Sequence, residues 1–138
     1  MTVSEQLVDA ARTLSKACNK AIGNIENKTI VAHATNPLDY AWLHHEQYLH
    51  KWSNYGAKTL LLGMNPGPWG MAQSGVPFGA TEIARTMLEI VPHPLKTPDN
   101  AHPKRPIIGL ELKRQEISGQ RLWSLMFDYY GDGRTVFS

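Results

Sequence analysis

The sequence contains a single cysteine, no long apolar run and little excess charge, and the first two of these shortages exclude classes of protein. Cys18 has no partner for an intramolecular disulfide, so the chain fits a reducing compartment such as the nucleus or the cytosol. No apolar run approaches the roughly 20 residues of a bilayer span, and the first residues lack the apolar core of a signal peptide. We therefore expect no contact with a membrane.

The net charge does not by itself indicate a function. A formal net charge of +2 over 138 residues permits binding to nucleic acid but does not by itself indicate it. Hydrophobic residues make up 42% of the chain and charged residues 19%, which is typical of a globular domain. The length suits one domain with one core, and we expect a monomer.

The spacing of apolar residues predicts several helices. Each is bounded by capping or breaking residues: the first from Leu7 to about Gly23, the second from Pro37 to before Gly56, a short one over Ile83–Ile90 closed by Pro92, and the last capped by Ser118 and ended by Gly131.

Between these helices the run Thr59–Met64 predicts a strand buried on both faces, of the kind found in the middle of parallel sheets. Residues 107–110 are expected to be extended, and Thr135–Phe137 has the character of the start of a further strand. The predicted fold class is therefore α/β, with a central parallel sheet flanked by helices. A central strand needs neighbours on both sides, so we expect a single domain truncated after its first strands.

The loop Gly63–Met71 follows the predicted strand, where ligands bind in α/β sheets. Its three glycines and two prolines make it stiff, and Asn65 is its one polar side chain. The glycine spacing fits neither a Walker loop nor a dinucleotide fingerprint, and the prolines remove N–H groups that a phosphate nest needs. Two interpretations remain: a structural turn in which Asn65 bonds its own backbone, and a site that presents one amide.

The residues Gly63-Met-Asn-Pro-Gly-Pro-Trp-Gly-Met-Ala-Gln73, followed by Gly75-Val-Pro-Phe-Gly79, resemble the first active-site motif of the single-strand-selective monofunctional uracil-DNA glycosylases. Asn36-Pro-Leu-Asp-Tyr-Ala-Trp42 and His102-Pro-Lys-Arg-Pro106 also resemble that family. The resemblance runs from about residue 30 to residue 138, after a leading helix and connection over 1–29. It implies a three-layer uracil-DNA-glycosylase-like fold.

The resemblance also implies a function. A protein of this family would hydrolyse the N-glycosidic bond of uracil in single- and double-stranded DNA and so initiate base excision repair, with oxidised pyrimidines left open as further substrates. It would need no cofactor and no metal. It would act in the nucleus, or in the nucleoid or cytoplasm of a bacterium.

Residue roles follow from the same resemblance. Asn65 would orient the attacking water, backbone N–H groups around Met64 would hydrogen-bond the base, and Phe78 would stack on the flipped uracil. The remaining predicted substrate-binding residues are Gly63, Gly67 and Met71. Read alone, Phe78 is better explained as a core aromatic, although the Gly and Pro residues on both sides favour a displayed loop. For Met71, packing is the stronger interpretation.

Lys104 and Arg105 are candidate contacts to DNA phosphates. They belong to a basic cluster that also contains Lys113, Arg114 and Arg121. Because Glu111 and Glu116 interleave with these residues, a solvated face is the alternative interpretation. The histidines do not predict a metal site, because His45 and His50 are five residues apart and lie roughly 140° from one another on a helix. We expect His44, His45 and His50 to be surface or helix-packing residues.

Two parts of the family's active site have no counterpart in the sequence: an Asn in a second strand motif, and a His in a His-Pro-Ser-Pro loop. That His would stabilise the uracil oxyanion, and loss of one such partner typically slows catalysis about a hundredfold or more. The alternative function is therefore a truncated, catalytically deficient fragment that associates with DNA.

Overall fold

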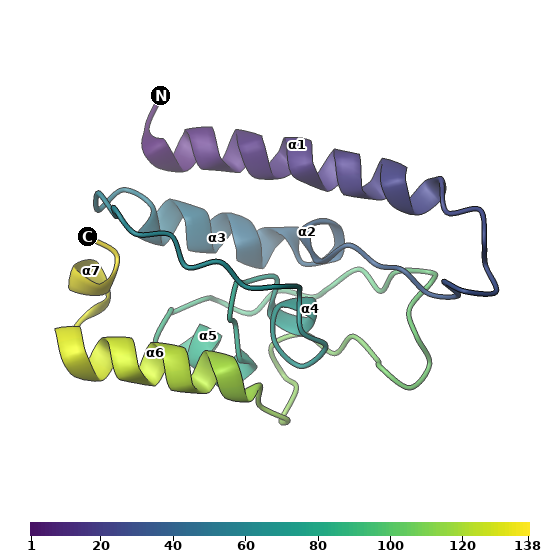
Figure 1. Cartoon of the computed structure of the whole chain (residues 1–138). Helices are drawn as coiled ribbons and strands as arrows, with labels where there is room; N and C mark the ends of the chain where they lie inside the picture. Colours follow the sequence, from purple (N-terminus) through teal and green to yellow (C-terminus); the bar gives the residue numbers. More distant parts are fainter.

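The computed structural model describes residues 1–138 and contains seven helices. In chain order they are α1 (Val3–Gly23), α2 (Pro37–Tyr40), α3 (Trp42–Trp52), α4 (Met71–Ser74), α5 (Thr81–Thr86), α6 (Ile117–Tyr130) and α7 (Gly133–Val136). α1 runs alongside α2 and α3, whereas α6 lies across the molecule from α1, with α4 and α5 between (Figure 1). None of the helices combines the length and apolar character that crossing a membrane requires.

Capping side chains determine where α1 and α2 each begin. Thr2 caps α1 in a capping box with Glu5, so this helix starts a turn earlier than the apolar spacing predicts. Asn36 caps α2 by accepting from the Leu38 N–H at 3.1 Å, and its amide nitrogen donates to the Ser15 carbonyl at 3.0 Å. One buried side chain therefore both starts α2 and docks it on α1.

The helix predicted from Pro37 is interrupted. Ala41, with φ −108° and ψ 26°, separates α2 from α3, and its carbonyl accepts from the N–H groups of both His44 and His45. Ala41 is only 1% exposed, and Gly75 packs directly against it. Because a side chain at position 75 would collide with Ala41, this glycine permits the close approach of the α4 region to α3.

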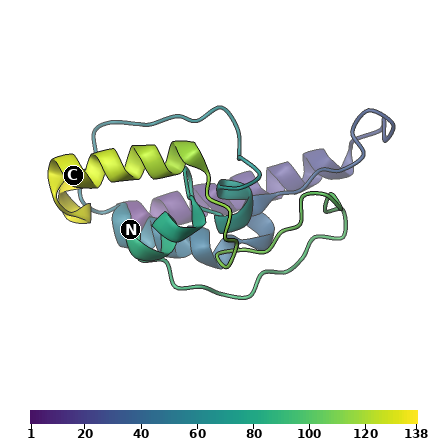
Figure 2. The same cartoon turned by 90° about the horizontal axis from the view of Figure 1, so that it is seen from below.

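The core lies between α5, α6 and the connections around them. Its buried members are Val76, Ala80, Ile83, Ala84, Leu88, Ile90, Leu110 and Trp123. Beside them the ring of Phe137 stacks on Trp52 at a centroid distance of 4.9 Å. The connection between α3 and α4 passes along one side of the molecule and the connection between α5 and α6 along the other (Figure 2).

The strand predicted at Thr59–Met64 is wrong. Leu60 is 83% exposed and Leu62 is 87% exposed, and the segment has no regular secondary structure. No backbone N–H between Ala57 and Gly67 donates to another part of the chain. A strand is stabilised by hydrogen bonds to neighbouring strands, and within residues 1–138 this segment has none.

The expected neighbours adopt other structures. Residues 135–137 do not begin a strand, because Asp132 accepts from the Thr135 N–H at 2.9 Å and thereby caps α7. In the segment 107–110, the N–H groups of Ile108 and Gly109 both donate to the Gln73 side chain. The predicted α/β class, with its three-layer uracil-DNA-glycosylase-like arrangement around a central parallel sheet, is therefore wrong for this chain, which is all-helical.

Candidate active site

The loop Gly63–Met71 borders a cavity of about 580 Å³, a size that suits a small organic ligand. Its lining comes from the loop, from the turn before α5 and from the start of α6. The lining residues are Leu61, Leu62, Gly63, Met64, Asn65, Pro66, Gly67, Gly70, Met71, Pro77, Phe78, Glu116 and Ser118. The structure thus gathers in one cavity all the residues for which the sequence predicts a catalytic or substrate-binding role.

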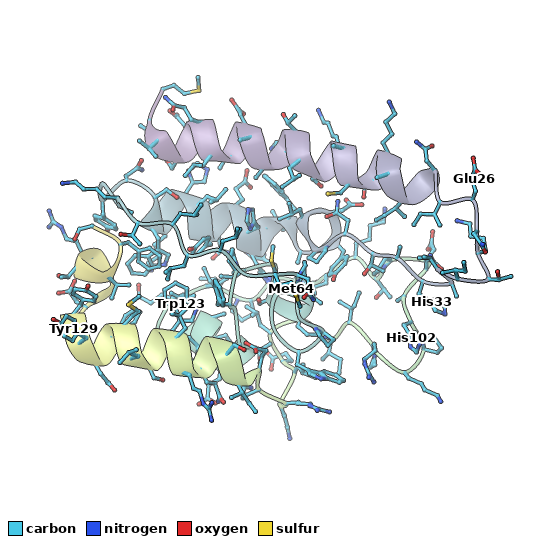
Figure 3. The ribbon with its side chains drawn as sticks, viewed as in Figure 1. Glu26, His33, Met64, His102, Trp123 and Tyr129 are labelled. Carbon is cyan, nitrogen blue, oxygen red and sulfur yellow. The ribbon has the colours of Figure 1, made fainter.

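Asn65 presents its amide at the surface of this cavity. Its Nδ2 donates to the Pro66 carbonyl at 3.3 Å, which is the local backbone bond expected of a structural turn. Its Oδ1 makes no hydrogen bond within the chain, so it is available to accept one from a ligand or water. Met64 is 97% exposed on the same connection (Figure 3), and its backbone N–H is also free of partners in the chain.

Phe78 is held in an unusual backbone conformation at the cavity wall. Its φ of 52° lies in the left-handed region, which costs a side-chain-bearing residue on the order of 1–2 kcal/mol. The Phe78 carbonyl accepts from Trp123 Nε1 at 3.0 Å and from the Ala80 N–H at 3.0 Å. A Cβ at Gly63 would lie 3.2 Å from Phe78 Cζ, so the glycine leaves room for the ring. The contacts around Phe78 maintain its strained backbone conformation. Its ring lies against Gly63 in the loop Gly63–Met71, called the motif loop below.

Glu116 is a cavity residue to which the sequence assigned no role. It caps α6 by accepting from the Ser118 N–H at 2.8 Å and from the Gly119 N–H at 2.5 Å, so the predicted cap at Ser118 is wrong by two positions. Partial burial disfavours the charged form, but hydrogen bonds from Ser118 and from the Gly119 N–H outweigh it and hold the Glu116 pKa below its ordinary value. An acidic residue just before a predicted helix is the sequence signal that could have indicated this cap.

Gln73 is the second residue that sequence reasoning missed. It is 1% exposed, and its Nε2 donates to the carbonyls of Pro68 and Pro106 at 3.0 and 2.9 Å. Its Oε1 accepts from the N–H groups of Ile108 and Gly109 at 2.8 and 3.1 Å. Each atom of the amide is satisfied, and the motif loop is thereby fastened to a segment more than thirty residues away.

The basic residues are only partly brought to the site. The Arg105 guanidinium lies 5.3 Å from the centroid of the Trp69 ring and that of Arg114 lies 4.3 Å from it. Lys104 is exposed and does not line the 580 Å³ cavity, and neither does Arg105. The two ion pairs of the chain, Arg12 with Glu46 and Lys51 with Glu89, leave both of these arginines unpaired.

In α3, His44 and His45 are buried and His50 is exposed. Both positions are among those that the sequence predicts, namely helix packing or the surface. His45 Nδ1 lies 2.8 Å from the Gly75 carbonyl, and His44 Nε2 accepts from the His93 N–H at 2.8 Å. Burial lowers the pKa of both rings. Neutral imidazoles therefore join α3 to the turn after α4 and to the connection that follows α5.

Several curated proteins are similar in sequence to the chain. It is 39% identical over 119 residues to the single-strand selective monofunctional uracil DNA glycosylase of Bos taurus, a match that covers 86% of the chain and 43% of that protein. The proteins of the same name from Mus musculus and Rattus norvegicus are 45% and 44% identical over 102 residues, which cover 74% of the chain and 36% of each relative. The chain thus spans about two fifths of the length of these relatives, in their amino-terminal part. No protein-family model matches the chain.

Proposed function

Because the chain belongs to the family of single-strand selective monofunctional uracil DNA glycosylases, as a relative of their amino-terminal part, we propose that its 580 Å³ cavity receives a uracil base from DNA. The reaction is hydrolysis of the N-glycosidic bond, the first step of base excision repair. The observation that carries the proposal is that Asn65, Met64 and Phe78 line one cavity. A DNA substrate implies a nuclear location, or the nucleoid or cytoplasm of a bacterium.

Asn65 has the chemistry to orient the attacking water. Cleavage builds positive charge on the sugar, so water must be aimed at the sugar carbon more than it must be deprotonated. An amide oxygen is too weak a base to ionise water but accepts a hydrogen bond from it. The Oδ1 atom of Asn65 has no partner in the chain, which leaves it available for that bond.

Phe78 and the backbone near Met64 have the chemistry to recognise the base. A base taken out of a strand loses its stacking, which an aromatic ring replaces. Phe78 lines the cavity, and its neighbouring turn is fixed by Trp123 and Gly119. The free N–H of Met64 offers a donor to a uracil carbonyl oxygen.

One feature of the lining favours a second candidate function, namely association with DNA at low turnover. The departing uracil carries negative charge, but the cavity lining has no Lys, Arg or His and does contain the carboxylate of Glu116. Without a cationic partner for the oxyanion, catalysis by these residues alone would be slower by a factor of about 100 or more.

The test is uracil release from a single-stranded oligonucleotide under single-turnover conditions, which detects slow cleavage. We expect Asn65→Ala to reduce the cleavage rate about a hundredfold or more and to leave oligonucleotide binding within about twofold, because the amide acts on water rather than on the strand. Met126→Leu, in α6 and outside the cavity lining, nearly conserves side-chain volume and should keep most of the activity.

An unchanged cleavage rate in the Asn65 variant would refute its role. Binding of the uracil-containing strand without any release, in the unaltered chain, would favour the second candidate.

A further inference from the structure

A smaller cavity of about 180 Å³ lies against the same motif loop. Pro66 lines both this cavity and the 580 Å³ cavity, so the two cavities adjoin at a conformationally rigid residue. The polar groups of the smaller cavity come from His33, Thr35, Tyr40, Gln73, His102 and Arg105. No acidic side chain lines it. Its volume is below that of a drug-sized pocket but several times the about 30 Å³ of one water molecule, which suits a small anion.

The two histidines are positioned by contacts with each other and with backbone groups. Their rings meet edge to face at 4.9 Å (Figure 3), although they come from segments far apart in the sequence. The Lys104 N–H donates to His102 Nδ1 at 3.0 Å, so the neutral ring carries its proton on Nε2 and that atom is a donor. The Asn100 amide, oriented to satisfy both partners, bridges the Ala32 carbonyl and the Ala34 N–H at 3.2 Å each and so holds the backbone on both sides of His33.

Arg105 supplies charge that nothing in the chain neutralises. It has no acidic partner within ion-pair distance, and its guanidinium lies over Trp69, a residue of the motif loop. Arg114, also unpaired, lies over the same indole ring. A bound anion would supply the countercharge that Arg105 lacks.

We propose that the cavity of His33, His102 and Arg105 is a phosphate site that holds a backbone phosphate of the strand whose base enters the neighbouring cavity. The inference rests on the proposed function only for the source of the phosphate. The anion chemistry itself follows from the donors: a guanidinium that binds phosphate oxygens in pairs and an imidazole N–H at its side. Because Pro66 borders both cavities, a phosphate bound here would fix the position of the strand relative to Asn65.

Binding of a thymine-only single-stranded oligonucleotide, followed by fluorescence anisotropy over a range of salt concentrations, tests the site without any cleavable base. We expect Arg105→Gln and His102→Gln each to weaken binding about tenfold at low salt. Arg105→Gln should also reduce the slope of log affinity against log salt by about 0.7, the value for one phosphate contact on a single strand. Both side chains are exposed, so the variants should fold normally. Arg134→Gln, in α7 at the far end of the molecule from His33 and His102, is the control and should change neither quantity.

Proton NMR of the histidine rings with inorganic phosphate gives an independent measurement. The ring signals of His33 and His102 should shift as phosphate is added, whereas that of the exposed His50 should not. Shifts with the oligonucleotide at lower concentration than with free phosphate would support a DNA source. The proposal is overturned if Arg105→Gln leaves affinity and slope unchanged, if phosphate shifts neither ring, or if phosphate shifts them but the oligonucleotide does not.

The phosphate site and the uracil pocket can be rejected independently. Absence of phosphate binding in a chain that shows Asn65-dependent cleavage would reject only the phosphate site. Phosphate binding at His33 and His102 in a chain that neither binds nor cleaves uracil would reject only the uracil pocket.

Discussion

Gln73 connects the motif loop to the rest of the molecule through one buried amide. Replacement by Leu would leave the carbonyls of Pro68 and Pro106 and the N–H groups of Ile108 and Gly109 without partners. Each unsatisfied buried group costs about 1–3 kcal/mol, so we expect Gln73→Leu to lower the free energy of unfolding by at least about 2 kcal/mol. Chemical denaturation measures this change.

Gln47 provides the matched control. Its amide also pairs with backbone, donating to the Val91 carbonyl at 3.0 Å and accepting from the Val91 N–H at 2.9 Å, but these bonds are exposed to solvent. Water can replace them, so Gln47→Leu should cost less than about 1 kcal/mol. Equal losses of unfolding free energy in the two variants would show that burial of the Gln73 amide does not strengthen its contribution to stability.

The start of α6 shapes one wall of the 580 Å³ cavity. Glu116 caps the helix, and Gly119 lies so close to the Phe78 carbonyl that a side chain there would collide with it. We expect Glu116→Ala to cost about 1 kcal/mol and to speed amide hydrogen exchange at Ser118 and Gly119, because both N–H groups lose their acceptor. Asp128→Ala, in the same helix but without hydrogen bonds from its side chain, should leave both amides unchanged.

The elements also show how much of the fold the sequence could predict. The apolar spacing predicts that α1 and α6 exist and Gly131 predicts where α6 ends, but α1 begins a turn earlier than predicted and the α6 cap lies two residues before Ser118. The break at Ala41 depends on packing against Gly75, a distant residue, and no local pattern reveals it. The apolar run at Thr59–Met64 has strand character, but a strand also needs neighbours, and whether these form is not encoded in the run itself. The motif predicted residues that the fold brings to one cavity, whereas Gln73 and Glu116 matter through contacts that only the fold creates.

For the molecule as a whole, the buried histidines of α3 predict a specific dependence of stability on pH. Burial holds the pKa of His44 and His45 below the ordinary value of about 6.5, so the unfolded chain binds protons before the folded chain does. The free energy of unfolding should be constant from pH 8 to 7 and should fall below about pH 6.5, by at most about 1.4 kcal/mol per pH unit for each ring.

Thermal denaturation between pH 8 and 5 measures this dependence. The capping carboxylates Glu5, Glu116 and Asp132 have pKa values below their ordinary ones, so they contribute stability above about pH 4.5 that is lost only at lower pH, outside this window. The exposed His50→Gln should keep the decline, whereas the double variant of His44 and His45 to Gln should flatten it. A decline of the same size in the double variant would contradict the assignment.

The cavity bordered by Gly63–Met71 and Phe78 is proposed to recognise uracil. The most direct measurement is the NMR spectrum of the isotope-labelled chain during titration with two single-stranded oligonucleotides that differ only in one uracil or thymine. We predict shifts of the Met64 and Asn65 amides and of the Phe78 ring that appear at lower concentration with the uracil strand. Equal responses to both strands, or shifts confined to residues outside the cavity, would contradict uracil recognition by this cavity.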